Sequence, residues 1–144
     1  MATQSFFMLF DRNGKPILPG SGAFRRPDWV ELIYFTAGGA QGNLRQQETT
    51  FRLSFNDGAY SRILAGLVAD GRHAASGMLF TTTEDGKAYV RYVLFDPLPT
   101  SFQTSDSNDG SAPFQSLEIE SRLVSLTYRS PEGTVTQKTL RASE

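Results

Sequence analysis

Side chains that can bind a metal or transfer a proton are few in this chain of 144 residues, and they are scattered along it. His73 is the single histidine and there is no cysteine, so the chain cannot form a metal site from several imidazole or thiolate ligands. His73 follows a predicted helix, where an imidazole can form a hydrogen bond or place a charge near the helix end. We therefore expect a structural role for His73.

Acidic residues form two short patterns that can be compared with known chemistry. Glu118 and Glu120 are two residues apart in a predicted strand, so their carboxylates share one face, as the paired acids of glycoside hydrolysis must. They alternate with Leu117 and Ile119, which is the pattern of an ordinary strand facing water or a pore on one side. Residues 106–110 (Asp-Ser-Asn-Asp-Gly) resemble the start of a calcium loop, but the glycine comes one residue early and no glutamate stands at the twelfth position. We favour a solvated surface in both cases.

Motifs for nucleotide binding and for nucleophilic catalysis are incomplete. Residues 20–22 (Gly-Ser-Gly) lack the third glycine of a dinucleotide fingerprint, and the Gly-Lys pairs at 14–15 and 86–87 lack the upstream glycine of a P-loop. No Gly-x-Ser-x-Gly elbow occurs. The sequence thus predicts no catalytic residue, no cofactor and no metal site, and we expect that the protein is not an enzyme.

The charge balance also excludes some partners. Fourteen basic and fifteen acidic residues leave a net charge of −1, which gives no indication of binding to nucleic acid or to an anionic membrane. The apolar run at residues 6–10 is too short for a signal peptide or a membrane span. We expect no membrane insertion and, if the protein leaves the cell, a route other than general secretion.

One helix is predicted, at about residues 57–70. Its apolar side chains recur at i, i+3, i+4, i+7 and i+8 and are Tyr60, Ile63, Leu64, Leu67 and Val68. Asn56 or Asp57 is expected to cap its start, and Gly71 is expected to end it in the left-handed conformation. Ser61 is expected on the solvated side. A helix of about three turns cannot bury its own apolar stripe, so it needs a sheet to pack on.

The remainder of the chain has the alternation and turn residues of strands. The predicted strands are residues 6–10, 29–36, 49–55, 77–83, 87–95, 100–104, 115–128 and 134–140. An Asn-Gly pair at 13–14 and a Gly at 86 indicate tight turns, and a phase slip near 121–122 indicates a β-bulge. We predict one mainly β domain over residues 1–144, a small antiparallel β-barrel of two packed sheets with roughly eight or more strands and one flanking α-helix.

Residues 29–36 are apolar on both faces except at Glu31, so we expect one face in the core and the other against the helix or another chain. They lead into residues 37–48, a glycine- and amide-rich stretch predicted to be a long loop. Leu44 and Arg45 are the best anchors in that loop, one apolar and one able to form a bidentate ion pair.

The order of these segments resembles the haemolysin-coregulated proteins (Hcp), the tube subunits of type VI secretion systems, over roughly residues 5 to 130. The matching segments are 6–10 (FFMLF), 29–32 (Trp-Val-Glu-Leu), the glycine-rich loop, the Phe51/Phe55 strand before the helix, 71–73 (Gly-Arg-His), 93–95 and 123–128. None of them is a catalytic signature, so the resemblance depends on order and spacing.

The resemblance implies a homo-hexameric ring that stacks into a tube inside a contractile sheath and is expelled with a spike protein at its tip. Members of the family can carry effector proteins in the lumen. The protein would then be cytoplasmic during assembly and afterwards secreted without a signal peptide. Its important residues would be assembly surfaces, because the family has no active site to transfer.

The candidates for such an assembly interface combine the two-faced strand with the loop after it. They are Trp29, Glu31, Gly38, Gly39, Gln41, Gly42, Asn43, Leu44 and Arg45. Other interpretations stay open: a phage-like tail tube protein, a monomeric small barrel that binds an apolar ligand between Phe and Tyr side chains, and a small enzyme of unknown type. Mass in solution separates a ring from a monomeric binder.

Overall fold

The computed structural model describes residues 3–22, 28–38, 49–105 and 114–141. Within these ranges the chain forms ten β-strands and one α-helix. Their bounds are β1 (Thr3–Phe10), β2 (Val30–Leu32), β3 (Tyr34–Gly38), β4 (Thr49–Asn56), α1 (Ala59–Asp70), β5 (Ser76–Thr83), β6 (Tyr89–Phe95), β7 (Leu98–Ser105), β8 (Phe114–Ser121), β9 (Leu123–Arg129) and β10 (Val135–Arg141). The alternating apolar residues thus predicted most of these strands.

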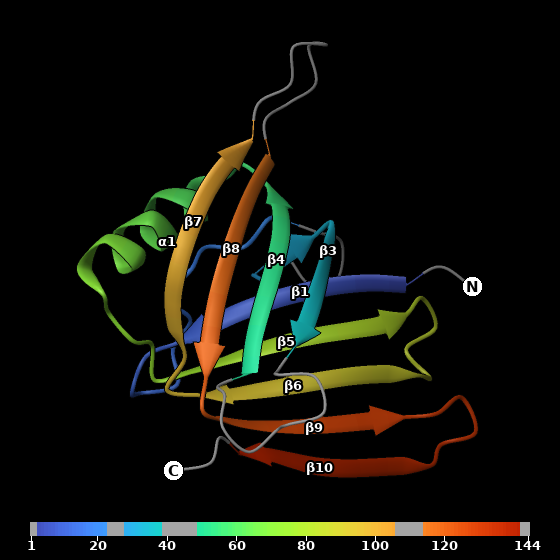
Figure 1. The fold of residues 1–144 in the computed structure, drawn as a ribbon. Helices are drawn as coiled ribbons and strands as arrows, with labels where there is room; N and C mark the ends of the chain where they lie inside the picture. Colours follow the sequence, from blue (N-terminus) through green and yellow to red (C-terminus); the bar gives the residue numbers. More distant parts are fainter. Residues whose placement is uncertain (1–2, 23–27, 39–48, 106–113, 142–144) are drawn as a thin grey trace.

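The strands form two antiparallel sheets. One has six strands in the order β10-β9-β6-β5-β1-β2, and the other has four in the order β3-β4-β8-β7. The strands of one sheet run across those of the other, and α1 lies beside β7 (Figure 1). The predicted mainly β fold, with two packed sheets and one flanking helix, is confirmed. Every pairing among the described strands stays within one sheet.

The core lies between the two sheets. Its fully buried side chains include Phe7, Leu9, Leu79, Leu94 and Val124 from the six-stranded sheet and Phe51, Leu53, Leu117 and Ile119 from the four-stranded sheet. Tyr92 bridges the layers, with its ring 5.4 Å from that of Phe51 and 5.9 Å from that of Phe35. Burial of each large apolar side chain stabilises the fold by about 1.5–3 kcal/mol.

The single strand predicted at residues 29–36 is wrong, because the chain changes sheets within it. Val30 and Leu32 face the core from β2, and Phe35 packs against the core from β3. Ile33 stands between the two strands, is 54% exposed and donates its N–H to the Ser54 carbonyl at 2.7 Å. The side-chain parity that faces the core therefore reverses at Ile33, and this reversal makes the segment apolar on both faces.

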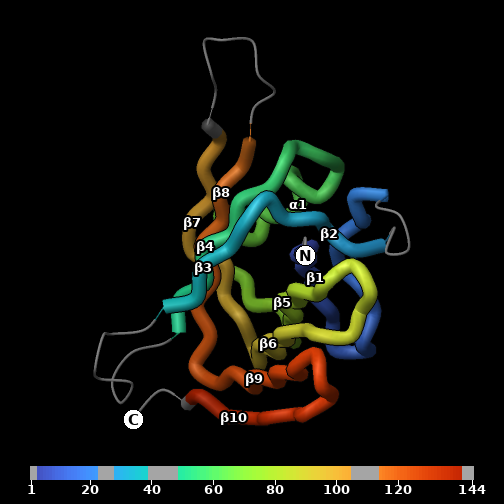
Figure 2. Tube along the Cα trace, turned by 90° about the vertical axis from the view of Figure 1, so that its right-hand side faces the viewer, coloured from blue at the N-terminus to red at the C-terminus, as the bar shows by residue number. Residues whose placement is uncertain are grey.

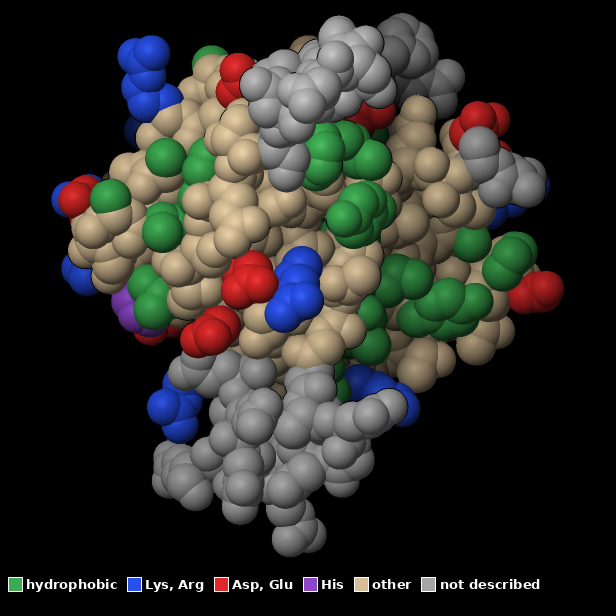
Figure 3. All heavy atoms as spheres, turned by 45° about the horizontal axis from the view of Figure 1, so that its top comes forward, with side chains coloured by type: hydrophobic (Ala, Val, Ile, Leu, Met, Phe, Trp, Pro, Cys, Tyr) green, Lys and Arg blue, Asp and Glu red, His purple; other side chains and the backbone are tan. Residues whose placement is uncertain are grey.

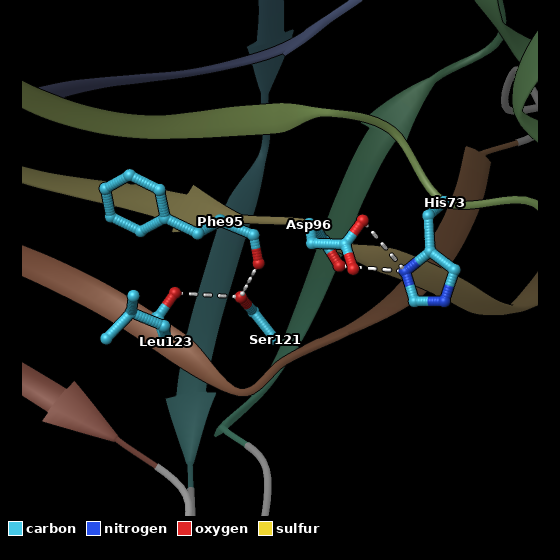
Figure 4. Close-up of polar contacts among 5 residues, drawn as sticks. All are labelled: His73, Phe95, Asp96, Ser121 and Leu123. Carbon is cyan, nitrogen blue, oxygen red and sulfur yellow. Dashed lines mark hydrogen bonds and ion pairs between the residues drawn. The ribbon is translucent and has the colours of Figure 1, made fainter. Parts of the chain in front are cut away.

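The bulge predicted near residues 121–122 is also a change of sheet. β8 ends at Ser121 in the four-stranded sheet, and β9 starts at Leu123 in the six-stranded sheet. The buried Ser121 Oγ donates to the Phe95 carbonyl at 2.9 Å and lies 3.0 Å from the Leu123 carbonyl (Figure 4). This hydroxyl joins the corner to the end of β6.

The helix begins two residues later than predicted and is capped differently. Gly58 is the N-cap residue, and its N–H donates to Ser61 Oγ at 3.2 Å. The predicted cap by Asn56 or Asp57 is therefore wrong. Ser61 is only 8% exposed, so its predicted solvation is wrong as well. Gly71 ends the helix with φ 60° and ψ 40°, as predicted.

The buried face of α1 is narrower than the predicted stripe. Tyr60, Leu64 and Leu67 are buried, whereas Ile63 is 36% exposed and Val68 is only partly buried. Ser61 lies on the buried face, where its hydroxyl oxygen accepts the hydrogen bond from the Gly58 N–H. None of the helices among the described residues is long and apolar enough to cross a membrane.

Candidate assembly surfaces

Trp29 packs on the face of the six-stranded sheet that points away from the core. Its ring meets that of Phe6 edge-on at 5.9 Å and that of Phe80 at 5.6 Å. The strand register pairs Phe6 with Phe80, one position from the core pair Phe7 and Leu79. Because Trp29 is half-buried by these rings, its first role is to cover the sheet within the protomer.

Glu31 is the exposed middle residue of β2. Its N–H donates to Ser21 Oγ at 2.8 Å, and the Ser21 N–H donates to the Trp29 carbonyl at 2.9 Å. These two bonds cover the outer edge of β2 with the segment around Ser21. The six-stranded sheet is therefore closed to further strand pairing at this edge. The backbone N–H of Glu31 is already bonded, so a partner would contact its exposed side chain.

A cleft of about 560 Å³ opens beside Glu31, between the β2–β3 corner, the end of β4 and the start of α1. Its lining residues are Gly20, Ser21, Glu31, Leu32, Ile33, Asn56, Asp57, Gly58, Ala59 and Tyr60. Two of them are acidic and none is basic. Gln115 Nε2 donates to Asp57 Oδ1 at 3.3 Å, which ties this carboxylate to β8.

The buried hydroxyl of Tyr60 forms the floor of this cleft and donates to the Asn56 carbonyl. Burial raises the pKa of Tyr60 above its ordinary value of 10.0, and the carboxylates of Asp57 and Glu31 raise it further, while a hydrogen bond with Ser21 opposes them. The hydroxyl therefore stays protonated, and the cleft carries a negative potential from two convergent carboxylates.

Gly38 is the last residue of β3, and a Cβ atom built on it would meet no other atom within 4 Å. Packing within the protomer thus does not require a glycine there. The other predicted interface residues, Gly39, Gln41, Gly42, Asn43, Leu44 and Arg45, lie outside the described residues.

The outer face of the four-stranded sheet is mostly polar, with Tyr34 and Phe114 as its exposed aromatic side chains in the described residues. Arg52 Nε lies 3.0 Å from Glu118 Oε1, and the side chains are 70% and 39% exposed. Register places Glu118 and Glu120 on this same face, opposite the buried Leu117 and Ile119. Figure 3 shows a basic side chain beside acidic ones near its centre, with hydrophobic side chains above them and to their right. Glu118 is thus part of an exposed ion pair, which agrees with the solvated interpretation.

His73 joins the end of the helix to the turn between β6 and β7. Its Nδ1–H donates to the Asp96 carbonyl at 2.9 Å, and Nδ1 lies 3.5 Å from Asp96 Oδ1 (Figure 4). Asp96 adopts the left-handed conformation with φ 53°, which directs its carbonyl to the ring. This contact is the hydrogen bond predicted for His73, and no group of three metal-ligating side chains occurs among the described residues.

The edge strands were missed by the sequence reasoning, because pairing partners depend on the completed fold. In the described part of the chain, β2, β3, β7 and β10 each pair with one neighbour only, and the segment around Ser21 covers the free edge of β2. β10 is the most unusual of these strands, since residues 135–139 are exposed on both faces. In the sequence, the polar composition of this strand was the feature that indicated its exposure.

Solved structures share this arrangement of two sheets and a helix. Hcp1 from Salmonella typhimurium superposes with a TM-score of 0.77 at 18% identity, covering 96% of this chain and 94% of that protein. The fold is that of the Hcp proteins. A type VI secretion system effector from Yersinia pestis matches with a TM-score of 0.77 at 13% identity, covering 95% of this chain and 98% of its own.

The Hcp fold also extends to a more distant protein, the tube-terminating cap of the anti-feeding prophage. It superposes with a TM-score of 0.53 at 13% identity over 94% of this chain and 87% of the cap. No protein-family model and no curated protein matches the sequence. The resemblance inferred from the order of the sequence segments is thus confirmed at the level of the fold.

Proposed function

We propose that this chain is the inner-tube subunit of a type VI secretion system or a related contractile injection machine. Six copies form a ring, rings stack into a tube in the cytoplasm, and the tube is then secreted without a signal peptide. The observation that carries this proposal is the Hcp fold, which covers nearly the whole chain and nearly the whole of its structural neighbours. The role is structural, and no catalysis is assigned.

Ring formation is supported by the edges of the four-stranded sheet. β3 and β7, its two outer strands, run in opposite directions, because neighbouring strands alternate in an antiparallel sheet of four. When identical copies meet with β3 beside β7, the alternation continues from one copy to the next. Such a head-to-tail contact closes into a ring when its rotation permits, and it removes both exposed edges.

The mostly polar outer face of the same sheet suits a water-filled lumen. This face carries few charges, and the opposite charges of Arg52 and Glu118 at its centre neutralise each other. A wall of this kind stays hydrated, and its exposed large apolar side chains among the described residues are Tyr34 and Phe114, at different places on the sheet. We place the outer face of β4 and β8 towards the lumen, with the sheath, spike and effector proteins of the machine as partners.

The test is the mass and shape of the purified protein. Sedimentation should give about six protomers, and electron microscopy should show rings with a central hole. A mass of one or two protomers at all concentrations would contradict the proposal and favour a ligand-binding module. A control is the same measurement in urea, where the mass should fall to one protomer.

A tail tube of phage type is the second candidate, and the similarity to a tube-terminating cap supports it. Both candidates predict rings. Co-purification separates them, because a type VI subunit should bind the sheath and spike proteins of its own secretion system. A monomeric binder of apolar ligands has less support, since two carboxylates, those of Glu31 and Asp57, line the described cleft beside Leu32, Ile33 and Tyr60.

A further inference from the structure

Two surfaces of opposite charge lie at opposite ends of the molecule. The acidic cleft is formed where β4 ends at Asn56 and α1 begins. The hairpin of β9 and β10 lies at the other end of the four-stranded sheet, where β8 ends at Ser121 and Arg122 leads into β9. Figures 1 and 2 agree on this arrangement, with the start of α1 towards the top and β10 at the bottom.

The hairpin is basic where the cleft is acidic. Arg122, Arg129 and Lys138 are exposed on it, against one acidic residue, Glu132. Among the residues that line the cleft, Glu31 and Asp57 are exposed acids and no base occurs. A chain with a net charge of only −1 thus has two exposed acids in the lining of the cleft and three exposed bases on or next to the hairpin.

β10 also buries little of its own surface in the protomer. It pairs with β9 from Val135 opposite Arg129 to Arg141 opposite Leu123, and in the described residues its other edge has no partner strand. Leu140 alone among residues 135–140 packs against the core. An edge strand exposed on both faces is a ready surface for a second chain.

We propose that the acidic cleft of one copy receives the basic β9–β10 hairpin of a second copy stacked head to tail, with Lys138 facing Glu31 and Asp57. This inference rests on the proposed tube function and adds to it the two surfaces that meet between rings. The second copy is the occupant because the chain itself carries both complementary charges at opposite ends, so that repeated stacking satisfies every cleft but the last.

The experiment reverses each charge and then exchanges the two. Glu31→Lys and Lys138→Glu are each compared with wild type by sedimentation for ring mass and by electron microscopy for tube length. Each single variant should keep rings of six and lose at least tenfold in the fraction of rings found in tubes. The double variant should restore stacking to within about threefold of wild type. Wild-type stacking should weaken as salt rises from 0.05 to about 0.5 M, because exposed charges are screened.

Matched controls carry the same charge changes elsewhere. Asp70→Lys at the end of α1 and Lys87→Glu in the β5–β6 turn should leave rings and tubes as in wild type. Glu31→Gln serves if the lysine variant does not fold, and it should reduce stacking less than charge reversal. The inference is overturned if both single variants stack normally, if the double variant fails to recover, if Glu31→Lys abolishes the rings themselves, or if wild-type rings do not associate at any salt. Absence of rings from wild type would instead contradict the proposed function.

Discussion

Trp29 and Glu31 were singled out together by the sequence, yet their surroundings differ. Trp29 has its ring against Phe6 and Phe80 within the protomer, whereas Glu31 is exposed and lines the cleft. Both residues lie on the outer side of the six-stranded sheet, since Glu31 pairs with Phe6 and the Trp29 ring packs on Phe6. Trp29, just before β2, is half-buried by its ring contacts, whereas Glu31, within β2, is exposed. The local context of each residue thus decides which of them is available to a partner.

The raised pKa of Tyr60 predicts how the stability of the fold changes at alkaline pH. Its raised pKa means that the unfolded chain loses the phenolic proton first, near pH 10, while the folded chain retains it. The protonated Tyr60 therefore stabilises the folded state. This contribution to the free energy of unfolding is complete below pH 10 and is lost as the pH rises through the pKa of the folded state. Tyr60→Phe should therefore flatten the fall in the free energy of unfolding between pH 9 and about 11, measured by urea titration.

The control for this prediction is Tyr128→Phe, at an exposed tyrosine of β9, which should show the wild-type decline. Tyr92 also has a pKa raised by burial, so a smaller decline should persist in the Tyr60 variant. Curves for Tyr60→Phe and wild type that remain parallel above pH 10 would show that the hydroxyl of Tyr60 has no such role.

Ser121 carries a second prediction at this scale. Its buried hydroxyl donates to the Phe95 carbonyl at the corner between the sheets, and Ser121→Ala removes this hydrogen bond. We expect a loss of about 0.5–1.5 kcal/mol in the free energy of unfolding. Thr139→Ala, on the exposed β10 strand, should change it by less than about 0.5 kcal/mol. Equal effects in chemical denaturation would mean that the corner does not depend on the hydroxyl.

At the scale of elements, periodicity predicted the strands and the helix because each element buries one face. The two errors in the strands fall where the chain crosses between sheets, at Ile33 and at residues 121–122. Where the chain changes sheets, the alternate residues that faced the core now face outwards. In the sequence alone, such a change has the same pattern as a strand that is apolar on both faces or as a β-bulge. The cleft could not be predicted either, since it is built by three elements distant in sequence.

The helix provides a prediction with an internal control. Leu64 is fully buried, whereas the adjacent Ile63 is 36% exposed. Leu64→Ala should lower the free energy of unfolding by about 2–5 kcal/mol, because it removes buried methyl groups and leaves a cavity. Ile63→Ala makes a similar chemical change at a wet position and should cost less than about 1 kcal/mol. Similar costs in thermal or urea unfolding would mean that α1 is not held by this face.

At the scale of the whole molecule, the sequence reasoning also favoured for assembly the segment between β3 and β4, whose residues 39–48 lie outside the described ranges. Gly38 and Thr50 are register partners, so the two strand ends lie one strand spacing apart, about 5 Å. Replacing residues 39–45 by a short Gly-Ser closure can therefore join the strands without moving either of them. The protomer should keep its melting temperature within about 3 °C, because its core is untouched.

Assembly is where this deletion should act. A long segment of glycines and amides between two paired strands costs ordering entropy in a monomer, and ordering it against another subunit compensates for that loss. We expect the shortened protein to form rings of six that fail to stack, as seen by sedimentation and electron microscopy. The control exchanges residues 39–45 for a Gly-Ser sequence of equal length. Failure of both variants would assign the effect to side chains such as Leu44 and Arg45, and failure of the short one alone would assign it to length. Normal tubes from both would show that stacking depends on other surfaces, such as the charged ends of the protomer.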